Sequence, residues 1–320
     1  MTPDQDPPYG LIAEQLQDGQ VVPFLGAAAS FAGIPEDREG ILPDAGGLAK
    51  RLITAWGGYP GGTEAADPLT RVTQFYVDAV ASRQDVFERL RKLFFEEQRG
   101  LRPAPTAELL ARIEPPESSP FLIITTNYDC QLEQALDGVG RPYALVIQDS
   151  SPDSEHDLQV WESGRERFEG IEKGSEFDIT KYNGKTLVYK LHGGFAHRLA
   201  ENLDTLVVTE GDYIQFLASV TMEAVPPRSI VRHMLQRRRM LFLGYSLQDW
   251  NLRVILYKLQ QRRLGKVEGM VKSWGVRNRL DPVERDFWDK REVRLFDMDL
   301  ADFVTELEAR LQAPVGGGTR

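Results

Sequence analysis

Polar side chains gather where the apolar run FLII, residues 121–124, gives way to the stretch TTNYD, residues 125–129. The amide of Asn127 can both donate and accept hydrogen bonds, whereas an ionised Asp129 only accepts them. Together with the Thr126 hydroxyl, this pair can hold an amide and orient a hydroxyl group or a water molecule. Asn, Asp and Thr also cap helices, so a capping role stays open here, and Asp129 can serve both purposes.

Small residues follow two other apolar runs. They are Gly26, Ala27, Ala28 and Ser30 after the run VVPFL, and Gly244 and Ser246 after the run MLFL, where Asp249 and Asn251 come next. Small side chains let a phosphate or ribose approach the backbone, and the N-terminus of a following helix favours an anion. Each stretch alone also fits a simpler interpretation, a tight turn packed with alanines in the first case and a helix cap at Asp249 in the second.

His192 comes directly after the apolar run TLVYKL and before two glycines. A histidine in this setting can act as a general base near neutral pH, and the glycines leave space for a substrate. A structural hydrogen bond is the alternative for His192. It is the interpretation that we give to His156, His197 and His233, which have no such setting.

Several other kinds of site find no support in the sequence. It contains no GxxxxGK[ST] phosphate loop, no GxSxG elbow and no spacing of His, Cys and Asp typical of a metal site, so we expect no metal ligands. Its single cysteine, Cys130, excludes an internal disulfide and a zinc site built from four thiolates. We expect the Cys130 side chain to pack inward.

Short apolar runs separated by helical patterns predict an α/β fold with a doubly wound, mainly parallel sheet. The runs are VVPFL (21–25), FLII (121–124), TLVYKL (186–191), LVV (206–208), MLFL (240–243) and VRLF (293–296). After the last run, apolar residues recur at helical spacing from 300 to 311, with Asp299 available as an N-cap. We expect one domain over residues 9–313.

Two long segments interrupt this pattern. Residues 46–113 read as several helices and predict a helical insertion subdomain that stands over the sheet. Residues 148–185 are rich in Asp, Glu, Ser and Gly and predict a surface insertion. The ends, residues 1–8 and 314–320, are expected to be disordered.

The charge balance argues against a surface that neutralises nucleic-acid phosphates. The net charge is −10 and the pI is near 5.1, so nucleic acid is expected only indirectly, through a partner. No apolar run is long enough to cross a bilayer, and the N-terminal residues lack the pattern of a signal peptide. We therefore expect a cytoplasmic protein without a membrane partner.

Taken in order, the stretches GAAAS with GIP, TTNYD, KLHGG and GYSLQDWN resemble the motifs of the sirtuin superfamily. Sirtuins carry a Gly-Ala-Gly turn with a nearby Ser and a Gly-x-Pro, then Thr-Gln-Asn-x-Asp, then His-Gly, then a Gly-x-Ser turn. The resemblance spans residues 21–251. The stretch from 273 to 307 is similar to the closing part of the divergent bacterial branch found in anti-phage defence proteins. This resemblance implies a Rossmann-like, sirtuin-type sheet.

The sequence departs from deacylating sirtuins in three places. The two Cys pairs that hold zinc after the His-Gly motif are missing, Ala28 replaces the usual second glycine, and GIPEDR only approximates Gly-x-Pro-Asp-Phe-Arg. These departures weaken the expectation of a peptide-binding cleft and leave the nucleotide half intact.

The resemblance also implies roles for the residues singled out above. Asp129 binds the nicotinamide carboxamide, Asn127 positions a water or a ribose hydroxyl, and His192 accepts a proton. The remaining residues expected to bind NAD+ are Gly26, Ala27, Ala28, Ser30, Thr126, Gly244, Ser246, Asp249 and Asn251.

The hypothesis that follows is an NAD+ hydrolase that releases nicotinamide and ADP-ribose, as an effector that depletes NAD+ during phage infection. A zinc-free protein deacylase or ADP-ribosyltransferase is one alternative. A non-catalytic NAD+ or ADP-ribose binding module of a larger complex is another. Because a toxic activity must be held off at rest, we expect control by homo-oligomer assembly or by a co-encoded ATPase of helicase or translocase type.

Overall fold

The computed structural model describes residues 6–35, 44–79, 82–96, 102–151, 154–196, 203–222, 224–236, 238–245, 253–258 and 273–312. The ends expected to be disordered therefore lie outside the described residues, except for residues 6–8. Among the described helices, none is long and apolar enough to cross a bilayer.

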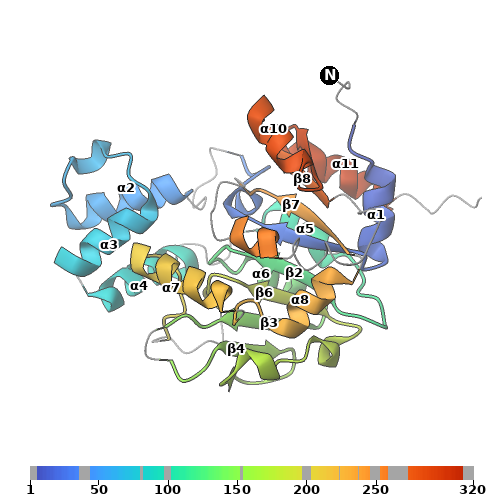
Figure 1. Cartoon of the computed structure of the whole chain (residues 1–320), viewed down its shortest axis with the longest axis horizontal. Helices are drawn as coiled ribbons and strands as arrows, with labels where there is room; N and C mark the ends of the chain where they lie inside the picture. Colours follow the sequence, from blue (N-terminus) through green and yellow to red (C-terminus); the bar gives the residue numbers. More distant parts are fainter. Residues whose placement is uncertain are drawn as a thin grey trace, which may run out of the picture.

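Nine described strands form one sheet in the order β5-β4-β3-β6-β2-β1-β7-β8-β9 (Figure 1). They are β1 (Val21–Leu25), β2 (Phe121–Thr125), β3 (Tyr143–Gln148), β4 (Leu158–Glu162), β5 (Glu169–Ile171), β6 (Thr186–Lys190), β7 (Arg239–Leu243), β8 (Ser273–Arg277) and β9 (Val293–Asp297). The seven strands from β3 to β9 in this order pair in parallel. The mainly parallel sheet predicted from the sequence is confirmed.

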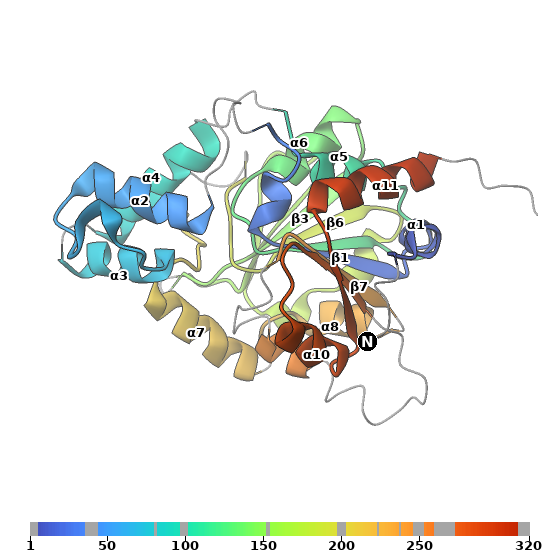
Figure 2. The ribbon, with the colours of Figure 1, turned by 90° about the horizontal axis from the view of Figure 1, so that it is seen from above.

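Helices cover both faces of the sheet, as Figure 2 shows. One face carries α1 (Tyr9–Gln17), α5 (Pro105–Ala111), α6 (Gln131–Gly138) and α11 (Leu300–Gln312), and the other carries α7 (Glu210–Thr221), α8 (Arg228–Leu235) and α10 (Pro282–Asp289). Successive side chains of a strand point to opposite faces. In β1, Val22 and Phe24 accordingly enter the core under α7, whereas Val21 and Leu25 enter the core under α1. Burial on both faces explains why the strands are apolar throughout.

A second group of helices stands apart from these layers, beyond the end of β1 that leads into η1 (Ala27–Ser30) (Figures 1 and 2). We call it the helical module; it comprises α2 (Ala45–Trp56), η2 (Gly62–Glu64), α3 (Leu69–Ala79), α4 (Arg83–Arg91) and the π-helical turn η3 (Lys92–Glu96). The module has its own apolar core, and this core continues into the sheet domain through Cys130, Phe195, Leu206 and Val208. Helix α5, which the sequence analysis grouped with residues 46–113, instead packs against α6 and α11 on the sheet.

Four segments differ from the sequence expectations. Residues 148–185, expected as a surface insertion, include β4 and β5, which extend the sheet in antiparallel fashion beside β3. Strands β3 and β8 were not among the predicted runs. Leu206–Val208, expected as a strand, pairs with none of the described strands. Its main-chain groups bond instead to the His192 carbonyl and to the side chains of Tyr128 and Asp212.

Short-range sequence signals set several helix starts. Asp299 accepts a hydrogen bond from the backbone N–H of Ala301, which confirms the predicted cap of α11. Ser82 and Thr209 form reciprocal capping boxes with Asp85 and Asp212 at the starts of α4 and α7. The loop that follows β6 therefore leads into a helix whose start is fixed.

Candidate functional site

The stretches singled out by their residue types lie at adjacent strand ends. They follow β6, β2, β1 and β7, which are consecutive neighbours in the sheet and run parallel. From β1 the chain continues to β2 on one side and later returns to β7 on the other. A crevice at such a reversal, outside the carboxyl ends of the strands, is where open α/β sheets bind ligands. Ser246, Asp249 and Asn251, the rest of the fourth stretch, lie outside the described residues.

The turns after β1 and β7 press against each other. The N–H of Gly26 donates to the Leu243 carbonyl at 3.0 Å, and the N–H of Ala28 donates to the Gly244 carbonyl at 3.1 Å. A Cβ on Gly244, whose φ is +68°, would lie 2.1 Å from the Ala29 nitrogen. The glycine at 244 is therefore required by backbone packing. Ala27 is exposed and Ala28 half-buried, so these two small residues remain open to a ligand.

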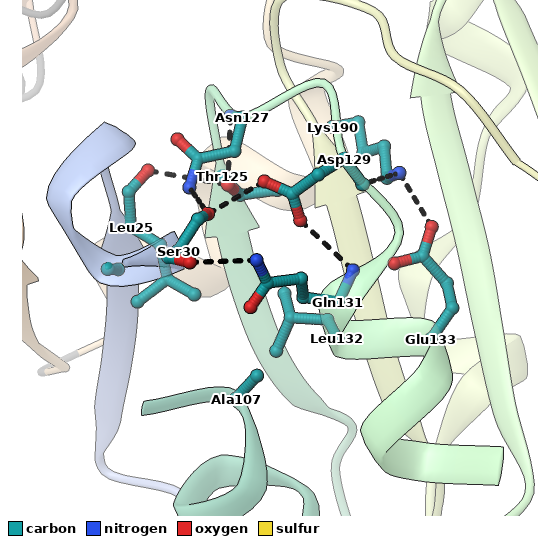
Figure 3. A pocket seen from close by; sticks show the side chains of 11 residues that line it. Leu25, Ser30, Ala107, Thr125, Asn127, Asp129, Gln131, Leu132, Glu133 and Lys190 are labelled. Carbon is teal, nitrogen blue, oxygen red and sulfur yellow. Dashed lines mark hydrogen bonds and ion pairs between the residues drawn. The ribbon is translucent and has the colours of Figure 1, made fainter. Parts of the chain in front are cut away.

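Ser30, Asn127 and Asp129 form one hydrogen-bonded group, which we call the strand-end triad (Figure 3). The Ser30 hydroxyl donates to Asp129 Oδ2 and accepts from Asn127 Nδ2, each at 2.7 Å. Asn127 Nδ2 also donates to the Gly26 carbonyl at 3.0 Å. The triad thus ties the turn after β1 to the loop after β2.

The orientation of the Asn127 amide follows from these bonds. Both protons of Nδ2 are used, and among the described residues no hydrogen bond to Oδ1 is present. In Figure 3 this oxygen points away from Ser30. The neighbouring backbone is also fixed, since the N–H of Asn127 donates to Thr125 Oγ1 and the N–H of Thr126 donates to the Leu25 carbonyl. The triad therefore presents a fixed acceptor oxygen at the strand ends.

Asp129 bonds to two segments at once. Its Oδ1 accepts from the backbone N–H of Gln131, the first residue of α6, at 3.0 Å, while its Oδ2 belongs to the triad. The N-cap position of α6 is Cys130, which makes no side-chain capping bond. The carboxyl group is buried. The bond to Gln131 fixes the side chain without using Oδ2.

A small pocket lies beneath the triad, between β1, β2, β6 and the helices α5 and α6 (Figure 3). Its lining includes three polar residues that the sequence analysis did not select, namely Gln131, Glu133 and Lys190. Gln131 Nε2 donates to the Ser30 carbonyl at 2.8 Å, and its Oε1 accepts from the N–H of Ala104 at 2.7 Å. One signal was visible in the sequence: Lys190 is a charged residue inside an otherwise apolar strand.

Lys190 and Glu133 form a buried ion pair with a nitrogen-to-oxygen distance of 2.6 Å. Burial raises the pKa of the Glu133 carboxyl, although the Lys190 ammonium lowers it. For Lys190, burial alone would lower the pKa, but attraction by Glu133 outweighs burial and the pKa is raised. The short contact and the raised pKa of Lys190 both reflect the attraction between the two side chains.

The backbone of His192 lies near the triad, but its imidazole ring does not. The loop that carries it approaches the loop after β2, because Phe195 N–H donates to the Tyr128 carbonyl at 2.9 Å. The imidazole ring lies against α7, with ring centres 4.8 Å from Phe216 and 5.5 Å from Tyr213. The side chain is buried and does not line the pocket. The structure thus brings Asn127 and Asp129 together with Ser30 and places the His192 ring on the other side of its loop.

The remaining reactive side chain, Cys130, packs inward as expected. Its thiol donates to the Phe195 carbonyl at 3.3 Å, and burial raises the pKa of this thiol above its ordinary value. A buried thiol with a raised pKa is a poor nucleophile. Within the described part of the chain, no group of three or more His, Cys, Asp or Glu side chains is arranged to hold a metal ion.

Comparison with known proteins gives a family match and a structural match. The family model described as SIR2-like domain matches residues 122–296, more than half of the 320 residues. A solved structure from work on the mechanism and regulation of Sir2 enzymes gives a TM-score of 0.41 at 15% identity, over 96% of this chain and 98% of that chain. The search of curated proteins finds no match. The family match runs from β2 to β9 and includes Asn127, Asp129 and His192.

Proposed function

Because this chain belongs to the SIR2-like domain family, we propose that it is an NAD+ hydrolase. Membership of the family supports NAD-dependent chemistry, and the finer assignment is the cleavage of the N-glycosidic bond between nicotinamide and ribose. Water adds to C1′ of the ribose, nicotinamide leaves with the bonding electron pair, and one proton is released. The products are nicotinamide and ADP-ribose.

The strand-end triad is the observation that supports this proposal most directly. Hydrolysis of NAD+ needs an acceptor for the carboxamide N–H groups and a second acceptor that orients a water or a ribose hydroxyl. Asp129 supplies a buried carboxylate, and Asn127 supplies the amide oxygen that no described residue uses. Because Ser30 bonds to both side chains, the two acceptors are held in one geometry before substrate binds, which lowers the cost of ordering them.

The reaction passes through an oxocarbenium-like state, so positioning and charge stabilisation contribute most. We propose that the carboxyl group of Asp129 binds the nicotinamide carboxamide of the substrate. His192 is proposed to accept the proton from the ribose hydroxyl or from the attacking water. Its ring rests against Tyr213 and Phe216, and catalytic hydrogen bonds often form only once substrate is bound. We propose that substrate binding draws the ring toward the triad.

The biological role that we propose is depletion of NAD+ by an effector of anti-phage defence in the bacterial cytoplasm. It rests on the resemblance of the motifs and of the stretch from 273 to 307 to the defence branch. Control would come from homo-oligomer assembly or from a co-encoded ATPase of the helicase or translocase type. Measuring NAD+ in infected cells that carry the parent or the Asn127→Ala chain tests this role: equal NAD+ levels in the two would contradict it.

The enzymatic proposal is tested with purified protein, NAD+ and product identification, with and without an acetylated peptide. Asn127→Ala and His192→Ala are each expected to lower cleavage about 10²-fold or more, because they remove an orienting acceptor and a proton acceptor. Asp129→Asn keeps the shape but exchanges an acceptor oxygen for an amide, and it should raise the KM for NAD+. Parent-like rates in folded Asn127→Ala and His192→Ala would show that the site is misassigned. Transfer to the peptide instead of water would favour the deacylase or transferase alternative.

A further inference from the structure

The ion pair between Lys190 and Glu133 lies at a junction between two loops. Lys190 is the last residue of β6, and Glu133 is in the first turn of α6. The side chains are only 1% and 4% exposed, so the pair is removed from solvent. A charged pair in this position is held by its surroundings and not screened by water.

The ammonium of Lys190 bonds to both loops at once. Its Nζ donates to the Asp129 carbonyl in the loop after β2 and to the Phe195 carbonyl in the loop after β6, each at 2.6 Å. The same ammonium forms the ion pair with Glu133. The first loop carries Asn127 and the second begins with His192, so one cation joins the backbones of the two loops that hold the proposed catalytic residues.

The loops are shaped around this side chain. Gly194 has a φ of +158°, and a Cβ there would lie 2.7 Å from Lys190 Cδ and 3.4 Å from the Tyr128 carbonyl oxygen. A glycine at 194 thus leaves the passage through which the lysine stem reaches between the loops. Loop amides are also fixed around it, since the N–H of Gly194 donates to Thr205 Oγ1.

Stability alone does not account for the pair. Replacing a buried ion pair by apolar residues of similar volume is often neutral or stabilising, because two desolvated charges are costly. Both carboxyl oxygens of Glu133 are buried and have no hydrogen-bond partner in the described part of the chain, and only Oε1 has the ion-pair contact with Lys190, which adds to that cost. What two apolar residues cannot supply is the pair of hydrogen bonds to the loop carbonyls.

We propose that Lys190 and Glu133 are positioning residues that fix the loop at 127–130 and the loop at 192–195 relative to each other, and that this spacing is required for cleavage of NAD+. Lys190 makes the loop contacts, and Glu133 keeps Lys190 protonated inside the protein. The proposal that the pair fixes the spacing of the loops rests on the contacts above. The proposal that this spacing is required for cleavage rests on the proposed function.

The test compares the parent with the double variant Lys190→Met/Glu133→Leu, which removes both charges at nearly constant volume and so keeps the fold. Lys190→Met alone strands a buried carboxylate and is the variant most prone to unfold. The matched control is Arg277→Met/Glu284→Leu, which removes an ion pair between β8 and α10 that does not line the pocket. Melting temperature, kcat, KM and amide hydrogen exchange are measured for each chain.

We expect the double variant to melt within a few degrees of the parent, and its kcat to fall about 10²-fold while KM changes less than about fivefold. Amides of 127–131 and 192–196 should exchange at least about tenfold faster, whereas the control changes neither rate nor exchange. Parent-like exchange in both loops overturns the positioning role, whatever the cleavage rate. A parent-like kcat in the double variant overturns the importance of the ion pair for cleavage. If the parent itself cleaves no NAD+, the proposed function fails, and the exchange comparison still decides the loop-spacing role.

Discussion

Among the described side chains, Ser30 is the one that bonds to both acceptors of the strand-end triad. Its hydroxyl has one proton, which it donates to Asp129, and the lone pairs that remain accept from Asn127. Without this hydroxyl, the Asp129 oxygen would be buried without its donor and the Asn127 amide would keep only its bond to Gly26. Ser30 thus orients the side chains of both Asp129 and Asn127.

Ser30→Ala is therefore expected to lower NAD+ cleavage roughly 10- to 100-fold, through loss of positioning. The free energy of unfolding should fall by about 1–3 kcal/mol, the usual cost of leaving a buried acceptor unsatisfied. Ser229→Ala is the matched control, because Ser229 also loses one hydrogen bond, to the Phe177 carbonyl, but lies away from the triad. Equal cleavage rates in the two variants would exclude a special role for Ser30.

His233 gives the stability of the fold a dependence on pH. Burial, with a second contribution from the Arg238 charge, lowers the pKa of this imidazole from 6.5 to about 4. Between these values the unfolded chain binds a proton that the folded chain does not, so the free energy of unfolding falls as the pH drops from 6.5 toward 4. At pH values above 6.5 the ring is neutral in both states and contributes no slope.

His233→Gln is expected to remove the contribution of His233 to the fall in the free energy of unfolding, which is on the order of 2–3 kcal/mol between pH 6.5 and 4. Urea unfolding at pH 7.5, 6.0 and 5.0 measures it as the difference in slope between parent and variant. The comparison at pH 7.5 is the internal control for the packing change that the substitution itself causes. Parallel declines in the two proteins would mean that His233 binds a proton equally in the folded and unfolded states, so that folding does not lower its pKa.

At the scale of elements, the sequence located the strand ends better than the direction of the side chains there. Asn127 and Asp129 fall where expected, because a short apolar run ending in polar residues marks the end of a buried strand. Strand alternation would place His192 on the same face as Lys190, two residues earlier. The strand ends at Lys190, however, and the turn at Gly193, with φ of +73°, leaves the ring against α7.

The contacts that Lys190 makes with both loops and with Glu133 could not be predicted, for a related reason. A lysine in an apolar run signals something unusual, but its partners come from separate parts of the chain that only the sheet order brings together. Strands β3 and β8 were missed because their runs contain polar or small residues such as Gln148, Ser273 and Gly275. A run of apolar residues predicts a local strand or helix, whereas the contact partners of a side chain on other elements depend on how the elements pack.

The helical module is tied to the sheet domain by Arg83, at the start of α4. Its guanidinium contacts Asp204 at 2.8 Å, Asp212 at 2.7 Å and the Leu206 carbonyl at 2.9 Å. These three groups belong to the segment that leads from the His192 loop into α7. Burial alone would lower the Arg83 pKa, but the two carboxylates outweigh it and raise the pKa. The contact joins the module to the element against which the His192 ring packs.

Arg83→Met keeps the aliphatic stem but loses the hydrogen bonds, and it should lower the free energy of unfolding by about 2 kcal/mol. This is below the cost for a fully buried pair, because the Arg83 side chain is 26% exposed. Lys290→Ala, which breaks an exposed pair with Asp286, is the control and should change stability by less than about 1 kcal/mol. An equally small change in both would show that water replaces the Arg83 contacts.

At the scale of the whole molecule, the carboxyl ends of β6, β2, β1 and β7 face the helical module (Figure 2). The module contacts the loops there directly: Phe94 packs against Tyr128 and Phe195, and the Thr73 hydroxyl donates to the Val208 carbonyl. We therefore expect the module to cover a bound nucleotide and to gate its access. Closure by such an element would also exclude water other than the one that reacts.

This gating predicts which amides a nucleotide protects from hydrogen exchange. With ADP-ribose, the proposed product, at about 100 times its Kd, amides that exchange through global unfolding should slow about 100-fold, equivalent to about 2.7 kcal/mol. Beyond that uniform change, extra protection is expected at 26–30, at 126–130 and in α3 and α4. Strands β4 and β5 serve as the internal control, because β3 and β6 separate them from β2. Protection of the two loops with no change in α3 and α4 would exclude the covering role of the module. Extra protection confined to β4 and β5 would place the nucleotide at the wrong edge of the sheet for the strand-end triad to act on it.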